Sequence, residues 1–504
     1  MRVAWHDAAD AALAAEGLAL AEEQRGRARL WWLEPLGSTA DKKGESPPAP
    51  PGVVPAILAE ADHLAGLGEA LGRTLPDGLR TVARFEGTRR SATIAAAPGE
   101  IASEIAGETA GEVVGEIAEE AAEGTAGQIA LDLLEGTLHT ARADRRLARL
   151  RLSGPPVAVF ALADQLLADL PCTVPATSLA AEALSFGAED VSPPSGLPVL
   201  PSAIAVSGAL AWMVASLART LVALAPSAAS GEGSEPVHQM RVALRRLRTA
   251  MTLLKPLVPG PAALTEATAG LGTLARALGP AREWDVFLEG TGPAVAAAFP
   301  KDAPLARLLK AARRRRDTAY AALRAELDQA DFRRLILRLA ALAVLRPWET
   351  PSLPARDMPD EAHGHAVPEA EAETALAEAA PALMQRRYRK LLSAASDIET
   401  ADAVHLHAIR LRAKRLRYAG ELLSPFFPRR DVQRFIRRLA RLQDRLGTVN
   451  DAVAVERLLA ELGPAGSGEA GGVVRGFVAA NALRERARVE AVWRKFRKQT
   501  PFWT

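Results

Sequence analysis

The sequence predicts a mainly α-helical protein of two related halves, preceded by a smaller region that mixes helix and strand. Three observations carry this prediction. A short stretch rich in His and Arg occurs twice, at 237–248 and at 406–417. From residue 203 onward, apolar residues recur with helical spacing. The 504-residue chain is also 49% hydrophobic but only 5% aromatic, with abundant Ala and Leu, which favours helices.

The repeat keeps one constant offset, and a fixed offset sets the architecture of a chain. Under it His238 matches His407, Arg241 matches Arg410, Arg245 matches Lys414, Arg246 matches Arg415, and Arg248 matches Arg417.

Each copy predicts an amphipathic helix, because it has no Gly or Pro and is rich in good helix formers. At about 100° per residue, one stripe of the first copy is apolar: Val237, Met240, Leu244, Leu247 and Met251. The polar stripe holds His238, Arg241, Arg245 and Arg248, with Arg246 to one side. The second copy repeats this with His407, Arg410, Lys414 and Arg417, and Arg415 to one side. Two such stripes indicate a site for a polyanion.

The bulk properties agree with an anionic partner for one part of the chain. A length of 504 residues predicts two or more domains. The net charge of +2 hides an internal asymmetry: Lys and Arg outnumber Asp and Glu between residues 238 and 348, whereas Glu100 to Glu123 contains acidic residues and no basic one. Separated charge of this kind points to an anionic ligand for the basic part.

Compartment signals predict a cytoplasmic protein. Cys172 is the only cysteine, which excludes an intrachain disulfide and favours a reducing compartment. The first residues lack the apolar core of a signal peptide. The run from Ala203 to Leu217 is apolar but short and is followed by Arg219, so we expect a buried bundle helix and no membrane partner.

The N-terminal region, 1–190, is expected to be an α+β domain. Residues 37–55 read as a loop, and 99–127 as a low-complexity insertion or a solvated helix. Alternation predicts strands at 82–88 and 147–152, with another candidate at 129–133. Pro155 and Pro156 then begin an amphipathic helix.

A linker at 191–202 is followed by a first helical half at 203–346, a second linker at 347–369 and a second helical half at 370–504. Helices are predicted in the first half near 203–225, 236–258, 262–279, 281–290, 303–328 and 331–346. They are predicted in the second half near 370–395, 402–424, 429–446, 449–462 and 470–498.

Further motifs accompany the two stripes. Leu278–Val286 reads LGPAREWDV, Leu446–Val453 reads LGTVNDAV, and the chain ends with Thr500-Pro501-Phe502-Trp503 plus one residue. With these motifs, residues 198–504 resemble a CHAD domain, the "conserved histidine α-helical domain", although Glu283 stands where that family usually has Asp. The resemblance implies two helical bundles related by pseudo-twofold symmetry, and a basic surface or channel that binds inorganic polyphosphate.

Residues 1–190 resemble a degenerate CYTH, or triphosphate-tunnel, domain. The traces are Ala14–Leu20, Ala83–Glu86 and the helix around Val159. The family's opening E-x-E-x-K is absent, and the chain is expected to begin beyond that strand. Arg149 and Arg151 stand where the family has alternating carboxylates, and cations there would repel a catalytic metal. The resemblance therefore implies a relict fold that is not an enzyme, with strands that form a partly open assembly.

Other basic residues are secondary candidates for ligand contact: Arg282, Arg313, Arg316, Arg434, Arg438 and Arg441. We expect Asp285 and Asp451 to orient stripe arginines by bidentate pairing. His363 and His365 lie near acidic residues in the second linker, but a linker is a poor metal cage, so we expect no metal and no cofactor.

The predicted function is non-catalytic binding of inorganic polyphosphate between two facing stripes, with association with polyphosphate granules as one option. RNA or DNA binding, or another polyanion-binding scaffold, is the alternative, and an active triphosphatase is a third. Single-strand binders add exposed aromatic residues for base stacking. The nearest ones here are Tyr418 and Phe426-Phe427, with no equivalents in the first copy. The sequence leaves the ligand length and the oligomeric state open.

Overall fold

The structure is a computed structural model that describes residues 1–36, 49–54, 56–95, 128–185, 197–258, 262–349 and 374–504. The chain divides into two compact units. The sheet unit comprises Met1–Ser195, Val214–Ala223 and Gln329–Pro347, and the helical unit comprises Gly196–Met213, Leu224–Asp328 and Trp348–Thr504. The predicted low-complexity insertion at 99–127, most of the loop at 37–55, and the second-linker histidines lie outside the described residues.

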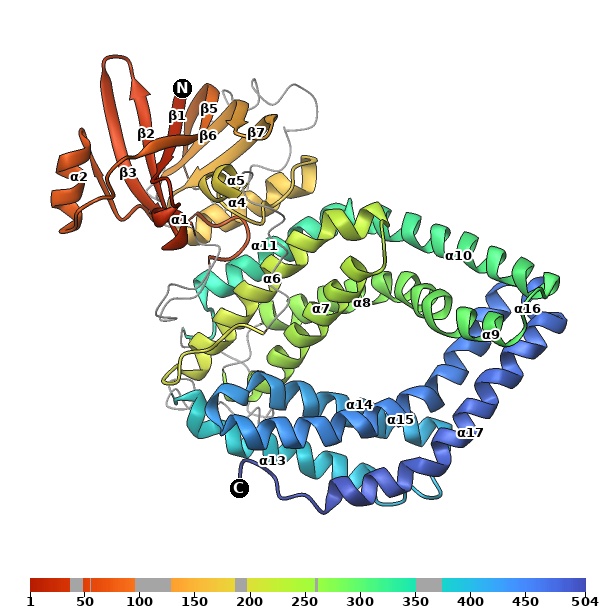
Figure 1. Cartoon of the computed structure of the whole chain (residues 1–504). Helices are drawn as coiled ribbons and strands as arrows, with labels where there is room; N and C mark the ends of the chain where they lie inside the picture. Colours follow the sequence, from red (N-terminus) through yellow and green to blue (C-terminus); the bar gives the residue numbers. More distant parts are fainter. Residues whose placement is uncertain (37–48, 55, 96–127, 186–196, 259–261, 350–373) are drawn as a thin grey trace, which may run out of the picture. The chain divides into compact units, whose positions relative to one another are not determined.

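The sheet unit is built on one antiparallel sheet of seven strands in the order β4-β3-β2-β1-β5-β6-β7 (Figure 1). The strands are β1 Arg2–Asp7, β2 Leu18–Arg25, β3 Ala28–Pro35, β4 Ala59–Ala61, β5 Arg80–Ala95, β6 Gln128–Thr140 and β7 Asp144–Ser153. The three strands expected from alternation are confirmed within β5, β6 and β7. In the described part of the chain, β4 and β7 are the edges of this sheet.

The expectation that the chain lacks an opening strand is wrong, because β1 begins at Arg2. Val3 and Trp5 alternate with more exposed residues and are buried, which is the pattern of a half-buried strand. The strand was not predicted because its alternating pattern contains only two large apolar residues, Val3 and Trp5, among small and polar ones. β1 lies in the middle of the sheet and pairs with both β2 and β5.

Helices cover the sheet in three places. Val3, Trp5, Phe85 and Leu138 form a core with α5, Leu179–Ser185, on one face. Leu20 and Leu33 point to the opposite face, where they pack with Leu13 of α1, Ala12–Ala15, and Leu67 of α2, Leu64–Leu71. Ile94, Ile129 and Leu131 pack against α4, Pro156–Asp169. The alternation of each long strand therefore supplies two apolar faces.

The last helix of the first helical half, α11 (Ala330–Leu345), belongs to the sheet unit and packs against α4. Arg334 donates to Asp164 from Nε at 2.9 Å and from a terminal nitrogen at 2.5 Å. The hydrogen bonds from Arg334 hold the pKa of Asp164 below its ordinary value, although burial opposes this effect. This bidentate ion pair fixes the two helices against one another.

The helical unit contains most of the predicted helices: α7 Glu235–Leu254, α8 Ala262–Val286, α10 Ala303–Leu327, α13 Leu376–Ala394, α14 Ala403–Leu422, α15 Arg429–Glu461 and α17 Glu469–Arg497. It also contains two short helices that were not predicted, α9 Gly292–Ala298 and α16 Pro464–Ser467. A π-helical turn, Phe287–Thr291, connects α8 to α9. The predicted breaks after residues 279 and 446 are wrong, because α8 and α15 run on. Buried residues on both sides of Pro280 and Gly447 hold these helices by packing.

One helix, α6 (Val206–Ser230), contributes to both units. Among the described residues it is the one helix long and apolar enough to cross a membrane by length and composition. Within its most apolar window, 72% of the residues are buried inside the protein. This burial agrees with the expectation of a bundle helix, since a core helix passes the same test.

Two apolar clusters hold the helical unit together. Trp284, Phe287 and Leu308 pack with Leu458, Val474 and their neighbours, joining α8 and α10 to α15 and α17. A second cluster is aromatic. Phe435 makes edge-to-face contacts with Phe496, Phe502 and Trp503, and the Trp503 indole N–H donates to Gln385 Oε1 at 2.9 Å. The C-terminal tail thereby ties α13, α15 and α17 together.

Asp285 is the centre of a buried cluster of hydrogen bonds in this unit. The residue is 1% exposed, and its carboxylate accepts from Arg316 Nε at 2.7 Å and from the Tyr320 hydroxyl at 2.8 Å. Burial and the Asp285 hydrogen bond raise the pKa of Tyr320. Arg316 also donates to the carbonyl oxygens of Gly231 and Gly233 at 3.4 Å. The expectation that Asp285 orients a stripe arginine is therefore wrong, because Asp285 joins α8 to α10 instead.

Replacing Asp285 with Ala should destabilise the protein by about 3 kcal/mol, because the change leaves the Arg316 guanidinium without its buried partner. Chemical denaturation followed by circular dichroism measures the effect. The control is Asp317→Ala, which removes an exposed carboxylate beside Arg316 and should cost under about 0.5 kcal/mol. Equal stability of the two variants would contradict the assigned role of Asp285.

Candidate anion-binding site

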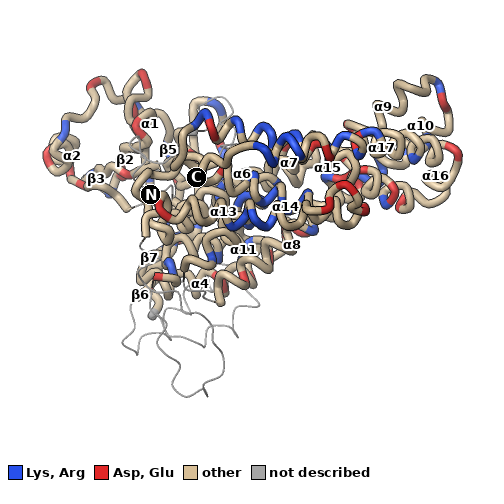
Figure 2. The backbone as a smooth tube through the Cα atoms, turned by 90° about the horizontal axis from the view of Figure 1, so that it is seen from below, with Lys and Arg blue, Asp and Glu red and all other residues tan. Residues whose placement is uncertain are grey.

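The two His/Arg repeats lie on α7 and α14, which pack against each other. Figure 2 shows Lys and Arg gathered along both helices. All five residues of the apolar stripe predicted on α7 are buried. On α14, Leu406, Ile409 and Leu416 are buried in the same manner, and Asp402 caps the helix by accepting from the His405 backbone N–H at 2.7 Å. Burial of the apolar stripes leaves the cations on the remaining faces.

Cations of the two helices meet around one tyrosine. The guanidinium of Arg245 on α7 lies 5.8 Å from the centre of the Tyr418 ring, and that of Arg417 on α14 lies 5.3 Å from the same ring. Tyr418 is buried, at 8% exposure. Its ring therefore contacts a positive charge from each copy of the repeat, and the structure brings these parts of the two stripes together.

The pKa of Lys414 reflects the positive charges around it. Its pKa is lowered to about 8, first by burial and then by Arg410, Arg245, Arg417 and Arg241. Two of these arginines lie on α14 and two on α7. Like charges and a dry environment both disfavour the protonated amine. Lys414 therefore lies in a positive field to which both helices contribute.

The two copies also have matching neighbours from the helices that follow them. His238 is half-buried, and its pKa is lowered by burial and by Arg282 of α8. His407 is exposed and forms a hydrogen bond through Nδ1 with Asn450 of α15. Arg282 and Asn450 occupy matching positions in the LGPAREWDV and LGTVNDAV motifs. Arg282, expected to be a secondary ligand contact, therefore lies close to the first stripe.

Matching arginines of the two stripes, Arg241 and Arg410, also have similar neighbours. Arg241 lies near Glu283, and Arg410 lies near Asp451, the matching acidic position. A Cβ added to Gly279 would lie 3.8 Å from Arg241, and one added to Gly447 would lie 3.8 Å from Arg410. The Nε atoms of Arg241, Arg245 and Arg410 are buried and make no hydrogen bond within the described residues. These nitrogens are donors that an anionic oxygen can use.

The stripe residues not yet described differ in their exposure to solvent. Arg248 and Arg415 are exposed, and Arg246 is half-buried. Burial is the largest cause that lowers the pKa of Arg246. Arg387 of α13 adds a further cation: it lies near Arg415 and donates to the carbonyl of Thr252 on α7 at 3.3 Å. Arg248 and Arg415 are thus open to solvent, and Arg387 extends the cationic surface to α13.

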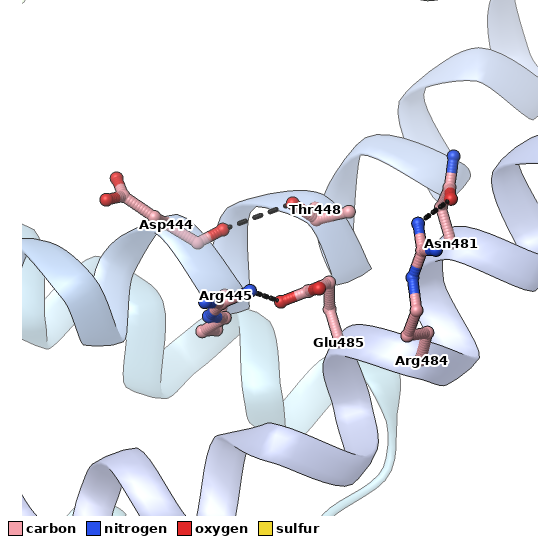
Figure 3. A pocket seen from close by; sticks show the side chains of 6 residues that line it. All are labelled: Asp444, Arg445, Thr448, Asn481, Arg484 and Glu485. Atoms are coloured by element: carbon pink, nitrogen blue, oxygen red, sulfur yellow. Dashed lines mark hydrogen bonds and ion pairs between the residues drawn. The ribbon is translucent and has the colours of Figure 1, made fainter.

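Some secondary candidates are not brought to the stripes. Arg316 is engaged by Asp285, as described above, and Arg313 is exposed on α10. Arg434, Arg438 and Arg441 share one face of α15 with Arg445. Arg445 pairs with Glu485 of α17 beside a pocket that α15 and α17 line (Figure 3). Gly447 and Asn450, which adjoin the α14 stripe, lie on the opposite face of α15. The Arg434–Arg441 ladder therefore faces away from the stripes.

Sequence reasoning missed the acidic members of the site. Glu421 pairs with Arg417 through a distance of 3.2 Å from Nε to Oε1, and Glu283 pairs with Arg457. The spacing of four residues between Arg417 and Glu421 was a readable signal for an ion pair on one helix. The Glu283–Arg457 pair joins helices α8 and α15, and no sequence spacing indicates such a contact.

The sheet unit has a charged face of its own. Arg149 and Arg145 of β7 both pair with Glu182 of α5. By strand register this face also carries Glu23 and Glu34 of β2 and β3, which are 5% and 8% exposed. The expectation that the region has lost its carboxylates is therefore too strong. Among the described residues, no group of three or more His, Cys, Asp or Glu is placed to hold a metal ion.

Comparisons with known proteins identify the helical part. The sequence model of the CHAD domain matches residues 213–460. A solved CHAD domain from the plant Ricinus communis is 24% identical, with a TM-score of 0.50 over 62% of this chain and 98% of that one. PptA from Streptomyces chartreusis is 16% identical, with a TM-score of 0.40 over 58% and 96%.

A search of curated proteins found no match. The Ricinus structure shares the fold of the helical part with this chain. With the sequence match, the repeated stripes and this shared fold in hand, residues 213–460 are a CHAD domain.

Proposed function

We propose that this protein binds inorganic polyphosphate, without catalysis, on the stripe pair. We define the stripe pair as His238, Arg241, Arg245, Arg246 and Arg248 of α7 with His407, Arg410, Lys414, Arg415 and Arg417 of α14. One observation carries the proposal: α7 and α14 pack together and hold the guanidinium groups of Arg245 and Arg417 at 5.8 Å and 5.3 Å from the centre of one ring, that of Tyr418. CHAD domains are associated with polyphosphate binding or related roles, which supports the same ligand.

The chemistry of the stripe pair suits a flexible chain of phosphates. Guanidinium groups bind phosphate oxygens bidentately, with charge-assisted hydrogen bonds. Cations held side by side repel, so the ligand-free protein contains electrostatic strain that an anion relieves. Each further phosphate of a long chain then binds at high effective concentration. Orthophosphate and short phosphates should therefore bind far more weakly than long polyphosphate.

The placement of Tyr418 favours polyphosphate over single-stranded nucleic acid. Base stacking requires an exposed aromatic face. Tyr418 is buried, and Arg245 and Arg417 lie against its ring. Phe427 contacts Phe502 in the aromatic cluster around the C-terminal tail. RNA and DNA remain outcomes of the binding test, because every polyanion gains from counterion release.

We also infer that the two stripes are related by a pseudo-twofold axis. Several matched contacts support this inference: the histidines beside the motif residues Arg282 and Asn450, and the bridge between Ala205 and Ala375 at the starts of α6 and α13. The sheet unit is proposed to be a degenerate triphosphate-tunnel fold without catalysis, because Arg149 and Arg151 of β7 stand where that family has carboxylates and would repel a metal ion. Association with polyphosphate granules in the cytoplasm is part of the same proposal.

Reversing the charges of Arg245 and Lys414 together, as R245E/K414E, should reduce affinity for long polyphosphate by at least about 100-fold. The reason is that the change places two carboxylates among the stripe cations. Fluorescence anisotropy with labelled polyphosphate measures the loss, and circular dichroism verifies that the helices are intact. R434E/R438E is the matched control, because it makes the same change in charge on the face of α15 that points away.

Polyphosphate, orthophosphate and single-stranded RNA of equal charge should be compared in the same assay over a range of salt. Neutralising about six phosphates predicts that the affinity falls by roughly four decades for each tenfold rise in salt. Unchanged affinity and salt slope in R245E/K414E would place the ligand elsewhere. Tighter binding of RNA than of polyphosphate would assign the site to nucleic acid.

Replacing Lys414 with Met should stabilise the ligand-free protein at neutral pH by about 1 kcal/mol. This figure is well below the free energy that corresponds to the whole pKa shift of Lys414, because the amine keeps contact with water. The folded-state pKa of about 8 lies below the ordinary value of 10.5. The unfolded chain therefore binds more protons between these values, and the stability of the wild type rises with pH across that window.

The gain from Lys414→Met should accordingly be complete below pH 8 and should shrink as the pH approaches 10.5. Denaturant titrations at several pH values measure the difference between the two proteins. Lys390→Met, which alters an exposed lysine of α13, is the control and should change the stability by less than about 0.5 kcal/mol. A gain from Lys414→Met that grows with pH would contradict the assigned environment.

A further inference from the structure

The two copies of the repeat are followed by different residues at one matching position. In the second copy, Glu421 follows Arg417 by four residues. The same offset places Thr252 four residues after Arg248 in the first copy. Thr252 and Arg248 are both exposed, and Arg248 makes no ion pair with an acidic residue in the described part of the chain. A carboxylate thus adjoins the stripe pair near the C-terminal end of α14, and the matching position on α7 has none.

Glu421 lies inside the positive field of both helices. Its Oε1 is 3.2 Å from Arg417 Nε, and its side chain is 27% exposed. Burial raises the pKa of the Glu421 carboxyl, and the positive charges of Arg417 and of Arg246 and Arg245 on α7 oppose that rise. Tyr418, one turn earlier, lies between Arg245 and Arg417. The Glu421 carboxylate therefore lies where an anionic oxygen of a ligand could interact with the guanidinium groups of Arg417, Arg246 and Arg245.

Resting on the polyphosphate binding proposed above, we propose that Glu421 is an internal counter-anion, which neutralises the cations at this end of the stripe pair and competes with the ligand for them. A phosphate that binds there must displace the carboxylate from Arg417 or bind beside a like charge. Both alternatives cost free energy that binding to Arg248, which has no acidic partner among the described residues, does not impose. Glu421 thus lowers ligand affinity and limits the repulsion between cations in the ligand-free protein.

If Glu421 is an internal counter-anion, removing its charge should raise the affinity for polyphosphate and lower the stability of the ligand-free protein. Glu421→Gln removes the charge and keeps the shape of the side chain. It should tighten binding of long polyphosphate by about fivefold or more. It should also lower the melting temperature measured without ligand, because the arginines lose their partner. A residue that only supports the fold would lower both stability and affinity.

The matched control is Glu490→Gln. Glu490 also forms an ion pair at 3.2 Å with an arginine four residues away, Arg494, on one face of α17. Because this pair lies outside the stripe pair, its loss should leave the affinity for polyphosphate unchanged. Anisotropy with labelled polyphosphate at fixed salt compares the wild type and both variants.

The reciprocal variant is Thr252→Glu, which gives Arg248 an acidic partner at the same spacing. It should weaken polyphosphate binding by about fivefold or more, and its exposed position lets it decide the question even where Glu421→Gln does not fold. The inference is overturned if the wild type binds polyphosphate while Glu421→Gln binds no tighter, or while Thr252→Glu binds equally well. A wild type that fails to bind polyphosphate instead overturns the proposed function.

Discussion

The arrangement of the site depends on one constraint: the apolar stripes of α7 and α14 must be buried, and their burial brings two rows of like charge together. Leu244 and Leu247 on α7, and Ile409 and Leu416 on α14, are each almost fully buried. Burial of such side chains stabilises a fold by roughly 2 kcal/mol each, which outweighs the repulsion between partly solvated cations. The fold can therefore hold Arg245 and Arg417 against one tyrosine, and lower the pKa of Lys414, without a ligand.

The acidic residues of the helical unit divide into two kinds. Asp285 is buried with Arg316 and Tyr320 and holds helices together. Glu283, Asp451 and Glu421 lie beside stripe cations and reduce the field without cancelling it. A polyanion site that must also release its ligand needs this balance, because an uncompensated cation cluster destabilises the folded state. The balance is tighter at the α14 end than at the α7 end, where Arg248 is exposed.

Much of the helical unit could be predicted from the sequence, because repeated motifs and helical spacing are local signals. The stripes and their apolar faces follow from spacing alone. The role of Asp285 could not, since its partner Arg316 lies on another helix and no local pattern indicates that contact. The Arg434–Arg441 ladder was expected to make secondary contacts with the ligand, but it shares a face of α15 with Arg445, which pairs with Glu485 of α17. In the sheet unit, β1 was missed because an apolar alternation of two residues is too short to stand out.

Chemical footprinting tests the central claim most directly, since it asks whether one ligand covers both helices. Lys414 can be acylated near pH 8 and the arginines modified with phenylglyoxal, with and without long polyphosphate, and the modified peptides quantified by mass spectrometry. We predict that polyphosphate slows modification of Lys414 and Arg245 at the same ligand concentration, while Arg434 and Arg438 react at an unchanged rate. Protection of only one of the two helices, or of the α15 ladder instead, would contradict a single site on the stripe pair.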